Sequence, residues 1–530
     1  MIHRGNWILE EQIMYTSRPG DPGIDRKYEE ALIEAETHMG QVHPARVAGE
    51  EIHARETFTV WSPIGKTLKT GVFQQCGMAE TEAAILAANE TYDDWSHTPW
   101  ETRCAFIDEA ADRLEEEYYH LAALITLECA KTRNESLAEV GEAVALLRYH
   151  STVIRDNDGF LRSMPADTET DRYESVMRPF GAWAVISPFN FPLVLGAGAA
   201  AAALITGNTV IMKPASATPL SMLTFCRILE DVGIPTGAAN CITGSGLAFG
   251  KAVSQSPGIA GLTFTGSRDA GTWLRQEFTT HQPYPKPVIL ELGSKNPCIV
   301  TAQADLKKAV EGVIRGAFGF SGQKCSATSR VYIEQPIFHT FVEMLTDQAA
   351  RCTFGDPRQK GIFMGPLIDS AAKERFDAAV ASVSAAGGYI LLGGRSFYGT
   401  ETQGAYFAEP TIVTGIPHDH PVMKNELFVP LVALATFTGI EEGIRLANDT
   451  EFGLTAGIFS EKPEEVEEFF SHIRFGVCYA NRKDGATTGG WPEYQSFGGW
   501  KGSGSTGRGV GGPYYLLSYM REQAQTRLAK

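Results

Sequence analysis

Short apolar strands alternate with helical segments from residue 182 onwards, and this alternation restricts the possible folds more than any other feature of the chain. The apolar runs AWAVIS (182–187), TVIMK (209–213) and GLTFTG (261–266) are separated by stretches with apolar residues at helical spacing. Such alternation is typical of βαβ units, in which helices cover both faces of a parallel sheet. We therefore predict a nucleotide-binding α/β domain of the Rossmann type in this part of the chain.

A second α/β series follows the first. Its predicted strands are CIVT (298–301), RVYIE (330–334) and FVPLVALATF (428–437). Its predicted helices cover 306–320, 336–351, 370–385 and 440–448. The two series meet near 291–297, so a cleft between them would be bordered by PVILEL of the first and GQKCSA of the second. Clefts between domains commonly hold active sites.

Length and composition set broad limits on the class of protein. A chain of 530 residues with 43% hydrophobic and 21% charged residues is an ordinary globular sequence, long enough for about two to four domains. Residues 79–155 are rich in helix formers, which predicts a helical block. The formal net charge of -17 opposes binding to a polyphosphate backbone, so nucleic acid is not expected as a partner.

The nine cysteines form no CxxC pair and no Cys/His cluster, so neither a disulfide framework nor a metal site is expected. This usage indicates a reducing compartment, and we expect a cytoplasmic protein. The start of the chain shows no basic stretch followed by an apolar one, as a secretory signal would. The apolar run at 194–207 is rich in Ala and Gly and shorter than the roughly 20 residues that a membrane span needs, which predicts a buried helix.

Three residues could carry chemistry. Cys325 lies among small residues in GFSGQKCSA, where backbone N–H groups could approach a thiolate. Glu291 ends an apolar strand, which would raise its pKa toward that of a base near neutral pH. Asn190 lies in a turn bracketed by prolines and could donate to an oxyanion. Each also has a purely structural interpretation: a packed cysteine, a solvated glutamate, and an asparagine that caps its own turn.

Two further positions fit a phosphate-bearing ligand. Lys213 directly follows a strand, and Ser267 is placed to cap a helix whose N-terminus would suit a phosphate group. The nearby GSG at 244–246 does not complete a GxGxxG fingerprint, so any dinucleotide must be held in another way.

These residues together resemble the aldehyde dehydrogenase superfamily, from about residue 50 to the C-terminal region. The motifs PFNFP, KPAS, FTGS, ELGSKNP, GQKC, NELFVP and FGG occur in the order and spacing of that family. Each motif alone is weak, but seven in register outweigh the structural interpretations. The resemblance implies an aldehyde dehydrogenase-like α/β fold, with a Rossmann-type cofactor domain, a second α/β catalytic domain and a small oligomerisation element.

Within the superfamily, the sequence most resembles the pyrroline-5-carboxylate dehydrogenases, which oxidise L-glutamate γ-semialdehyde in proline catabolism. The features are Ser326 directly after the cysteine, the pair Asn481 and Arg482 before a Gly-rich loop, and the ending GGPYYLLSYM. Two alternatives stay open: a dehydrogenase of another small carboxylated semialdehyde, and a non-catalytic structural or binding protein on the same fold.

The resemblance also implies roles for single residues. Cys325 would be the nucleophile, Asn190 with the Cys325 backbone N–H would form the oxyanion hole, and Glu291 would be the general base. Ser326, Gly485 and Ala486 would receive the substrate carboxylate. The residues implied to bind the cofactor are Ser187, Phe189, Lys213, Ser216, Gly246, Gly266, Ser267, Leu292, Glu426 and Phe428.

Four positions depart from the family pattern. Phe189 stands where many members have Trp, Ser294 occupies the second Gly of ELGGK, and Val429 replaces a Gly after the Phe. Ser216 stands where strongly NAD-selective members carry Glu. A neutral residue there would not repel a 2′-phosphate, so we expect NAD as cofactor and leave NADP open.

The expected domain boundaries follow from the same resemblance. The NAD(P)-binding domain would comprise 1–156 and 179–291, and the catalytic domain 292–482. The oligomerisation element would combine 157–178 with 483–530. We expect a homo-oligomer that acts on a small-molecule aldehyde, with no membrane partner.

Overall fold

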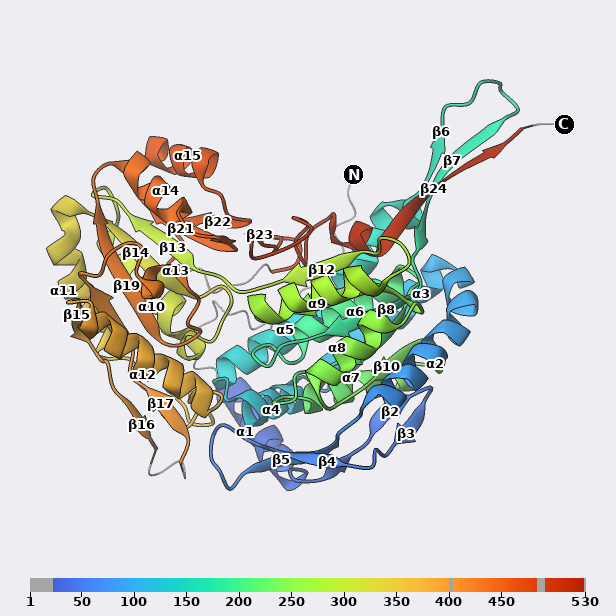
Figure 1. The fold of residues 1–530 in the computed structure, drawn as a ribbon, viewed down its shortest axis with the longest axis horizontal. Helices are drawn as coiled ribbons and strands as arrows, with labels where there is room; N and C mark the ends of the chain where they lie inside the picture. The colour runs from blue at the N-terminus through green and yellow to red at the C-terminus, as the bar shows by residue number, and fades with distance from the viewer. Residues whose placement is uncertain (1–21, 400–403, 484–490, 529–530) are drawn as a thin grey trace.

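Two seven-stranded sheets, each covered by helices, form the body of the molecule (Figure 1). The computed structural model describes residues 22–399, 404–483 and 491–528. In the first sheet the strand order is β12-β11-β8-β9-β10-β2-β3, and in the second it is β15-β18-β19-β14-β13-β21-β22. Both sheets have parallel centres with antiparallel pairs at one edge. This is the doubly covered parallel sheet that the strand–helix alternation predicts.

The first sheet confirms the elements expected from residue 182 onwards, with ends shifted by at most a few residues. Its strands are β2 (Ala45–Val47), β3 (Glu50–Ile52), β8 (Ala182–Ile186), β9 (Thr209–Lys213), β10 (Ala239–Cys241), β11 (Ile259–Thr265) and β12 (Val288–Glu291). The helices between its parallel strands are α6 (Val194–Ile205), α7 (Leu220–Asp231), α8 (Gly246–Gln255) and α9 (Arg268–His281). The expected helical block is present as α2 (Met78–His97), α3 (Trp100–Glu116), α4 (Tyr118–Cys129) and α5 (Arg133–Asp156).

The second sheet contains the predicted strands and several that the sequence did not reveal. Its strands are β13 (Asn296–Val300), β14 (Thr328–Glu334), β15 (Tyr389–Leu392), β18 (Thr411–Thr414), β19 (Leu431–Phe437), β21 (Thr455–Phe459) and β22 (Val477–Ala480). Its helices are α10 (Leu306–Phe318), α11 (Phe338–Ala349), α12 (Ser370–Ala385), α14 (Ile440–Asn448) and α15 (Pro463–His472). All four predicted helices of this series are confirmed.

Smaller elements lie around the two sheets. They are α1 (Pro22–Thr37), α13 (Pro421–Lys424), β1 (Val42–His43), β4 (Thr57–Trp61), β5 (Lys69–Gln74), β16 (Ser396–Tyr398), β17 (Tyr406–Ala408), β20 (Phe452–Gly453) and β23 (Trp500–Lys501). The pair β20 and β23 is antiparallel and joins the C-terminal segment to the region of the second sheet.

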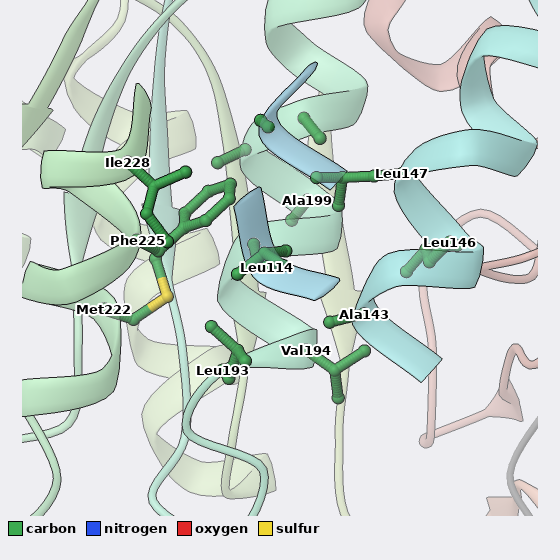
Figure 2. Packing of buried hydrophobic residues seen from close by; sticks show 14 of the residues in the cluster. Leu114, Ala143, Leu146, Leu147, Leu193, Val194, Ala199, Met222, Phe225 and Ile228 are labelled. Carbon is green, nitrogen blue, oxygen red and sulfur yellow. The ribbon is translucent and has the colours of Figure 1, made fainter. Parts of the chain in front are cut away.

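Helix α6 forms the centre of the largest hydrophobic cluster (Figure 2). All its residues except Leu195 are buried, which confirms the buried helix predicted from the Ala-rich run. Its small residues allow close packing: a Cβ at Gly198 would lie 2.3 Å from the Leu146 side chain of α5. Such burial is the main stabilising contribution to a core of this kind. Within the described residues, no helix combines the length and apolar character that crossing a membrane requires.

A three-stranded sheet projects from the body at the upper right of Figure 1. It consists of β6 (Leu161–Met164), β7 (Arg172–Pro179) and β24 (Met520–Arg527). Strand β24 pairs antiparallel with β7 from Met520↔Pro179 to Arg527↔Arg172. Residues 520–527 therefore lie beside residues 172–179, most of which belong to the 157–178 segment.

Candidate active site

A cavity of about 710 Å³ lies between the two sheets, and residues from both line it. Asn190 follows β8, Glu291 is the last residue of β12, and Cys325 precedes β14. Asn190 and Glu291 thus lie at the carboxyl ends of parallel strands, where open α/β sheets place their ligands, whereas Cys325 lies at the amino end of β14. The predicted residues that line this cavity are Ser187, Phe189, Asn190, Gly266, Ser267, Glu291, Leu292, Cys325, Glu426 and Phe428.

Three predicted cofactor residues are not among those that line the cavity. Lys213, at the end of β9, is buried, and its Nζ donates to the carbonyl oxygen of Pro214 at 2.7 Å. The Ser216 hydroxyl donates to the Gly244 carbonyl oxygen at 2.8 Å. Gly246 begins α8, and a Cβ there would meet no atom within 4 Å. Burial lowers the pKa of Lys213 to about 8.

Of the three predicted substrate residues, only Ser326 lies in the described part of the chain. Ser326 is buried, and its carbonyl oxygen accepts from the Thr455 hydroxyl at 3.4 Å. Gly485 and Ala486 lie outside the described residues.

The backbone before Cys325 adopts an unusual left-handed turn. Phe320, Ser321 and Gly322 have φ values of 48°, 54° and 70°. A left-handed conformation costs a residue with a side chain about 1–2 kcal/mol, so the surroundings must stabilise it. The Ser321 hydroxyl donates to the Gly365 carbonyl oxygen at 2.6 Å. A Cβ at Gly322 would lie 2.4 Å from the carbonyl oxygen of Val429, so only glycine fits there.

Cys325 is fixed through its own backbone. Its carbonyl oxygen accepts from Asn296 Nδ2 at 2.7 Å and also from the Ser294 hydroxyl. Ser294, one of the departures from the family pattern, thus ties the segment after Glu291 to the loop that carries Cys325. Burial, together with the nearby carboxyl groups of Glu426 and Glu291, raises the pKa of the Cys325 thiol to about 12.

Asn190 is held with its amide at the cavity. It is buried, and Nδ2 donates to the carbonyl oxygen of Gln323 at 3.0 Å. Gln323 is itself fixed, because its Oε1 accepts from the backbone N–H of Ile368 at 2.9 Å. An amide carries two protons on Nδ2, so a second donor remains for a ligand in the cavity.

Glu291 is half-buried, and one oxygen of its carboxyl group, Oε2, is shielded from solvent without a hydrogen-bond partner among the described residues. Burial raises the pKa of this carboxyl well above its usual value, and a hydrogen bond from the Gly499 backbone N–H offsets part of that rise. A carboxyl group with a raised pKa is suited to exchange protons near neutral pH.

Glu426 and two aromatic rings form another wall. Glu426 Oε1 accepts from the Ser294 backbone N–H at 2.7 Å, and burial raises its pKa to about 7. A Cβ at Gly293 would lie 2.3 Å from Glu426 Oε2, so a side chain at this position would displace the Glu426 carboxyl group. The rings of Phe189 and Phe428 meet edge to face with centroids 5.9 Å apart.

Helix α9 begins at the cavity and suits a phosphate group. Ser267 is its N-cap, as predicted, and its hydroxyl accepts from the Ala270 backbone N–H at 3.4 Å. A helix N-terminus carries unpaired N–H groups and a partial positive charge. This helix end and the neighbouring Gly266 line the same cavity as Cys325, so the residues present fit a phosphate-bearing dinucleotide.

A model of the "Aldehyde dehydrogenase family" matches residues 51–524. The chain belongs to the aldehyde dehydrogenase family. The resemblance drawn from the seven motifs is therefore confirmed, and so is the fold that it implies.

Named relatives narrow the comparison within the aldehyde dehydrogenases. A 1-pyrroline-5-carboxylate dehydrogenase of Bacillus cytotoxicus is 33% identical over 94% of this chain and 96% of its own length. The structure of a 1-pyrroline-5-carboxylate dehydrogenase from Thermus with bound NAD superposes with a TM-score of 0.90 at 28% identity, covering 97% of this chain and 99% of that one. Betaine aldehyde dehydrogenase from Staphylococcus aureus in complex with NAD+ gives a TM-score of 0.87 at 26% identity, covering 94% of this chain and 97% of that one.

Several residues of this aldehyde dehydrogenase site were not predicted. Arg375 of α12 and Val510 of the C-terminal segment line the cavity, as does Phe497. Phe497 and Val510 exchange two backbone hydrogen bonds at 2.8 and 2.7 Å. Phe497 opens the FGG motif and could have been found from it, whereas nothing local to Arg375 distinguishes it from other charged residues on helix surfaces.

Proposed function

We propose that this aldehyde dehydrogenase oxidises L-glutamate γ-semialdehyde to L-glutamate, with NAD as the hydride acceptor. The observation that carries the proposal is the convergence of Cys325, Asn190 and Glu291 on one cavity between the two sheets. The substrate follows from the relatives named 1-pyrroline-5-carboxylate dehydrogenase, of which the chain covers almost the whole length.

Cys325 and Asn190 perform the first step in this proposal. The Cys325 thiol first loses its proton to solvent, the thiolate sulfur then forms a bond to the aldehyde carbon, and the carbonyl π electrons move to the oxygen. Asn190 Nδ2 and the Cys325 backbone N–H donate to that oxyanion, and each such donor stabilises the transition state by about 3 kcal/mol in comparable sites. The tie from Ser294 and Asn296 to the Cys325 carbonyl holds the backbone donor in place.

NAD would be held by residues that line this cavity, together with Lys213, Ser216 and Gly246, which lie outside its lining. Gly266 and Ser267 would contact the pyrophosphate, Lys213 and Glu426 the ribose hydroxyls, and Phe428 the nicotinamide end. The remaining proposed contacts are Ser187, Phe189, Ser216, Gly246 and Leu292. When bound, NAD supplies the acceptor for the hydride that leaves the substrate carbon, which turns the adduct on Cys325 into a thioester.

Glu291 performs the second step. Its carboxylate takes a proton from water, the water oxygen forms a bond to the thioester carbon, and the carbon–sulfur bond breaks. The carboxylate product leaves, and the thiolate of Cys325 is regenerated. A raised pKa makes Glu291 a stronger base than a solvated glutamate.

Substrate choice is proposed to depend on the α-carboxylate end of the substrate, which Ser326 and the loop at Gly485 and Ala486 would receive. The test is a panel of semialdehydes of different chain length, assayed in steady state with NAD and with NADP. We expect kcat/KM for glutamate semialdehyde to exceed that for the others by at least about tenfold. A higher kcat/KM for another semialdehyde would contradict the substrate assignment.

The comparison of NAD with NADP in these assays tests the role of Ser216 in cofactor choice. Its neutral side chain does not repel a 2′-phosphate, so we expect measurable turnover with NADP, below that with NAD. A Ser216→Glu variant should lose the NADP activity and keep the NAD activity. Only NADP carries a 2′-phosphate, which the added carboxylate would repel.

We also propose a cytoplasmic location, a homo-oligomer and the domain division stated from the sequence. All nine cysteines lie in the described part of the chain and are free, as suits a reducing compartment. The projecting sheet of β6, β7 and β24 supports an oligomerisation role for 157–178 and 483–530, which cross-linking and light scattering would test.

A further inference from the structure

We propose that Ser503 is a positioning residue for Glu291, acting through the strand that carries this carboxyl group. Strand β12 is an edge strand of the first sheet, so one side of its backbone has no neighbouring strand within the sheet. The C-terminal segment covers that side, because Glu291 and Gly504 form an antiparallel bridge. The Leu292 backbone N–H donates to the Ser503 carbonyl oxygen at 2.9 Å.

The Ser503 side chain connects two distant parts of the chain. Ser503 is 0% exposed, and its hydroxyl donates to the Gly293 carbonyl oxygen at 2.8 Å. The same hydroxyl accepts from the Gly453 backbone N–H at 3.0 Å. Gly453 belongs to β20, so one hydroxyl links the end of the base-bearing strand to the neighbourhood of the second sheet. Removing it would leave a buried donor and a buried acceptor without partners.

Ser503 also packs against the group that contacts the base. A Cβ at Gly499 would lie 2.4 Å from the Ser503 carbonyl oxygen and 2.7 Å from its Cβ, so the two residues are in close backbone contact. The Gly499 backbone N–H donates to the Glu291 carboxylate, and this bond opposes the rise in the carboxyl pKa caused by burial. A shift of Ser503 would therefore move both the Glu291 backbone and its hydrogen-bond donor.

The first test measures how firmly Ser503 holds the strand that carries Glu291, and it does not depend on enzyme activity. Hydrogen–deuterium exchange of peptides covering 288–293 is compared between the wild type, Ser503→Ala and the control Ser254→Ala. Ser254 is also 0% exposed, but its hydroxyl has no hydrogen-bond partner among the described residues. We expect Ser503→Ala to accelerate exchange in 288–293 by about tenfold, with no change in the control. Unchanged exchange in Ser503→Ala would overturn the proposal.

The second test separates positioning from general destabilisation, and it rests on the proposed role of Glu291 in thioester hydrolysis. With the best semialdehyde of the panel, Ser503→Ala should form about one NADH per active site in a rapid first turnover and then turn over about tenfold more slowly than the wild type. The acidic limb of its steady-state pH profile should move to higher pH, because a weakened Gly499 bond raises the Glu291 pKa further.

The two proposals fail in different ways. A parallel loss of first-turnover amplitude and steady-state rate, with an unmoved pH limb, would show a merely structural role for Ser503 and overturn the positioning proposal. Absence of NADH formation by the wild type with every aldehyde would contradict the proposed function instead, while the exchange experiment would still decide whether Ser503 holds the strand.

Discussion

Cys325 and Glu291 face each other across one cavity, and burial acts on both in the same direction. It raises the pKa of the thiol to about 12 and that of the carboxyl group well above its usual range. The Cys325 thiol is therefore largely protonated over the neutral range in the ligand-free protein. A neutral thiol is a poor nucleophile, so the surroundings of Cys325 should protect it from electrophiles at neutral pH in the ligand-free protein.

This protection predicts how Cys325 reacts with an alkylating reagent. In the absence of ligands, the rate of iodoacetamide modification at Cys325 should rise about tenfold per pH unit from pH 7 to 10, because the thiolate fraction grows by that factor below the pKa. Peptide mass mapping identifies the modified residue. Glu426→Gln should react faster than the wild type at each pH, since removing this carboxylate lowers the thiol pKa. A plateau near pH 8 would show that the thiol is already ionised.

Two buried glutamates connect neighbouring helices: one links α5 to α6, and the other links α4 to α7. Glu139 of α5 accepts from the backbone N–H groups of Leu193 and Val194 at 2.9 and 3.2 Å, where α6 begins, and pairs with Lys131. Glu128 of α4 accepts from the Ser221 backbone N–H at 3.1 Å, at the start of α7. Carboxylates stabilise helix N-termini, so Glu139 and Glu128 hold α6 and α7 at their N-terminal ends.

Glu139 should therefore contribute strongly to stability. Both side chains of the Glu139–Lys131 pair are 0% exposed, so Glu139→Ala leaves a buried cation and two N–H groups unpaired. We expect a loss of about 3–5 kcal/mol in the free energy of unfolding, measured with urea. The control is Glu30→Ala, which removes an exposed pair with Arg26 and should cost at most about 0.5 kcal/mol. Equal losses in the two variants would refute this role.

Elements with a strong local pattern were predictable, and those defined by distant contacts were not. Helices such as α6 and strands such as β9 carry their apolar spacing within the segment itself. The left-handed turn at Phe320 and Ser321 has no such pattern, because its conformation depends on Gly365 and on the close approach of Val429.

The whole molecule brings together segments that are far apart in the chain, and here the sequence is least informative. Motifs identified Cys325, Glu291 and Asn190, because their residue types stand at characteristic spacing. They could not indicate that Ser503 reaches both Gly293 and Gly453, since that arrangement exists only after the C-terminal segment packs between the two sheets.

The central claim is that Cys325 carries the substrate and Glu291 releases it, and trapping the acyl-enzyme tests it most directly. Glu291→Gln incubated with NAD and glutamate semialdehyde should form one NADH per chain and show, by intact-mass spectrometry, one acyl group that maps to Cys325. Cys325→Ala should form neither product. Turnover of Glu291→Gln at the wild-type rate without an adduct, or aldehyde oxidation by Cys325→Ala, would contradict the account.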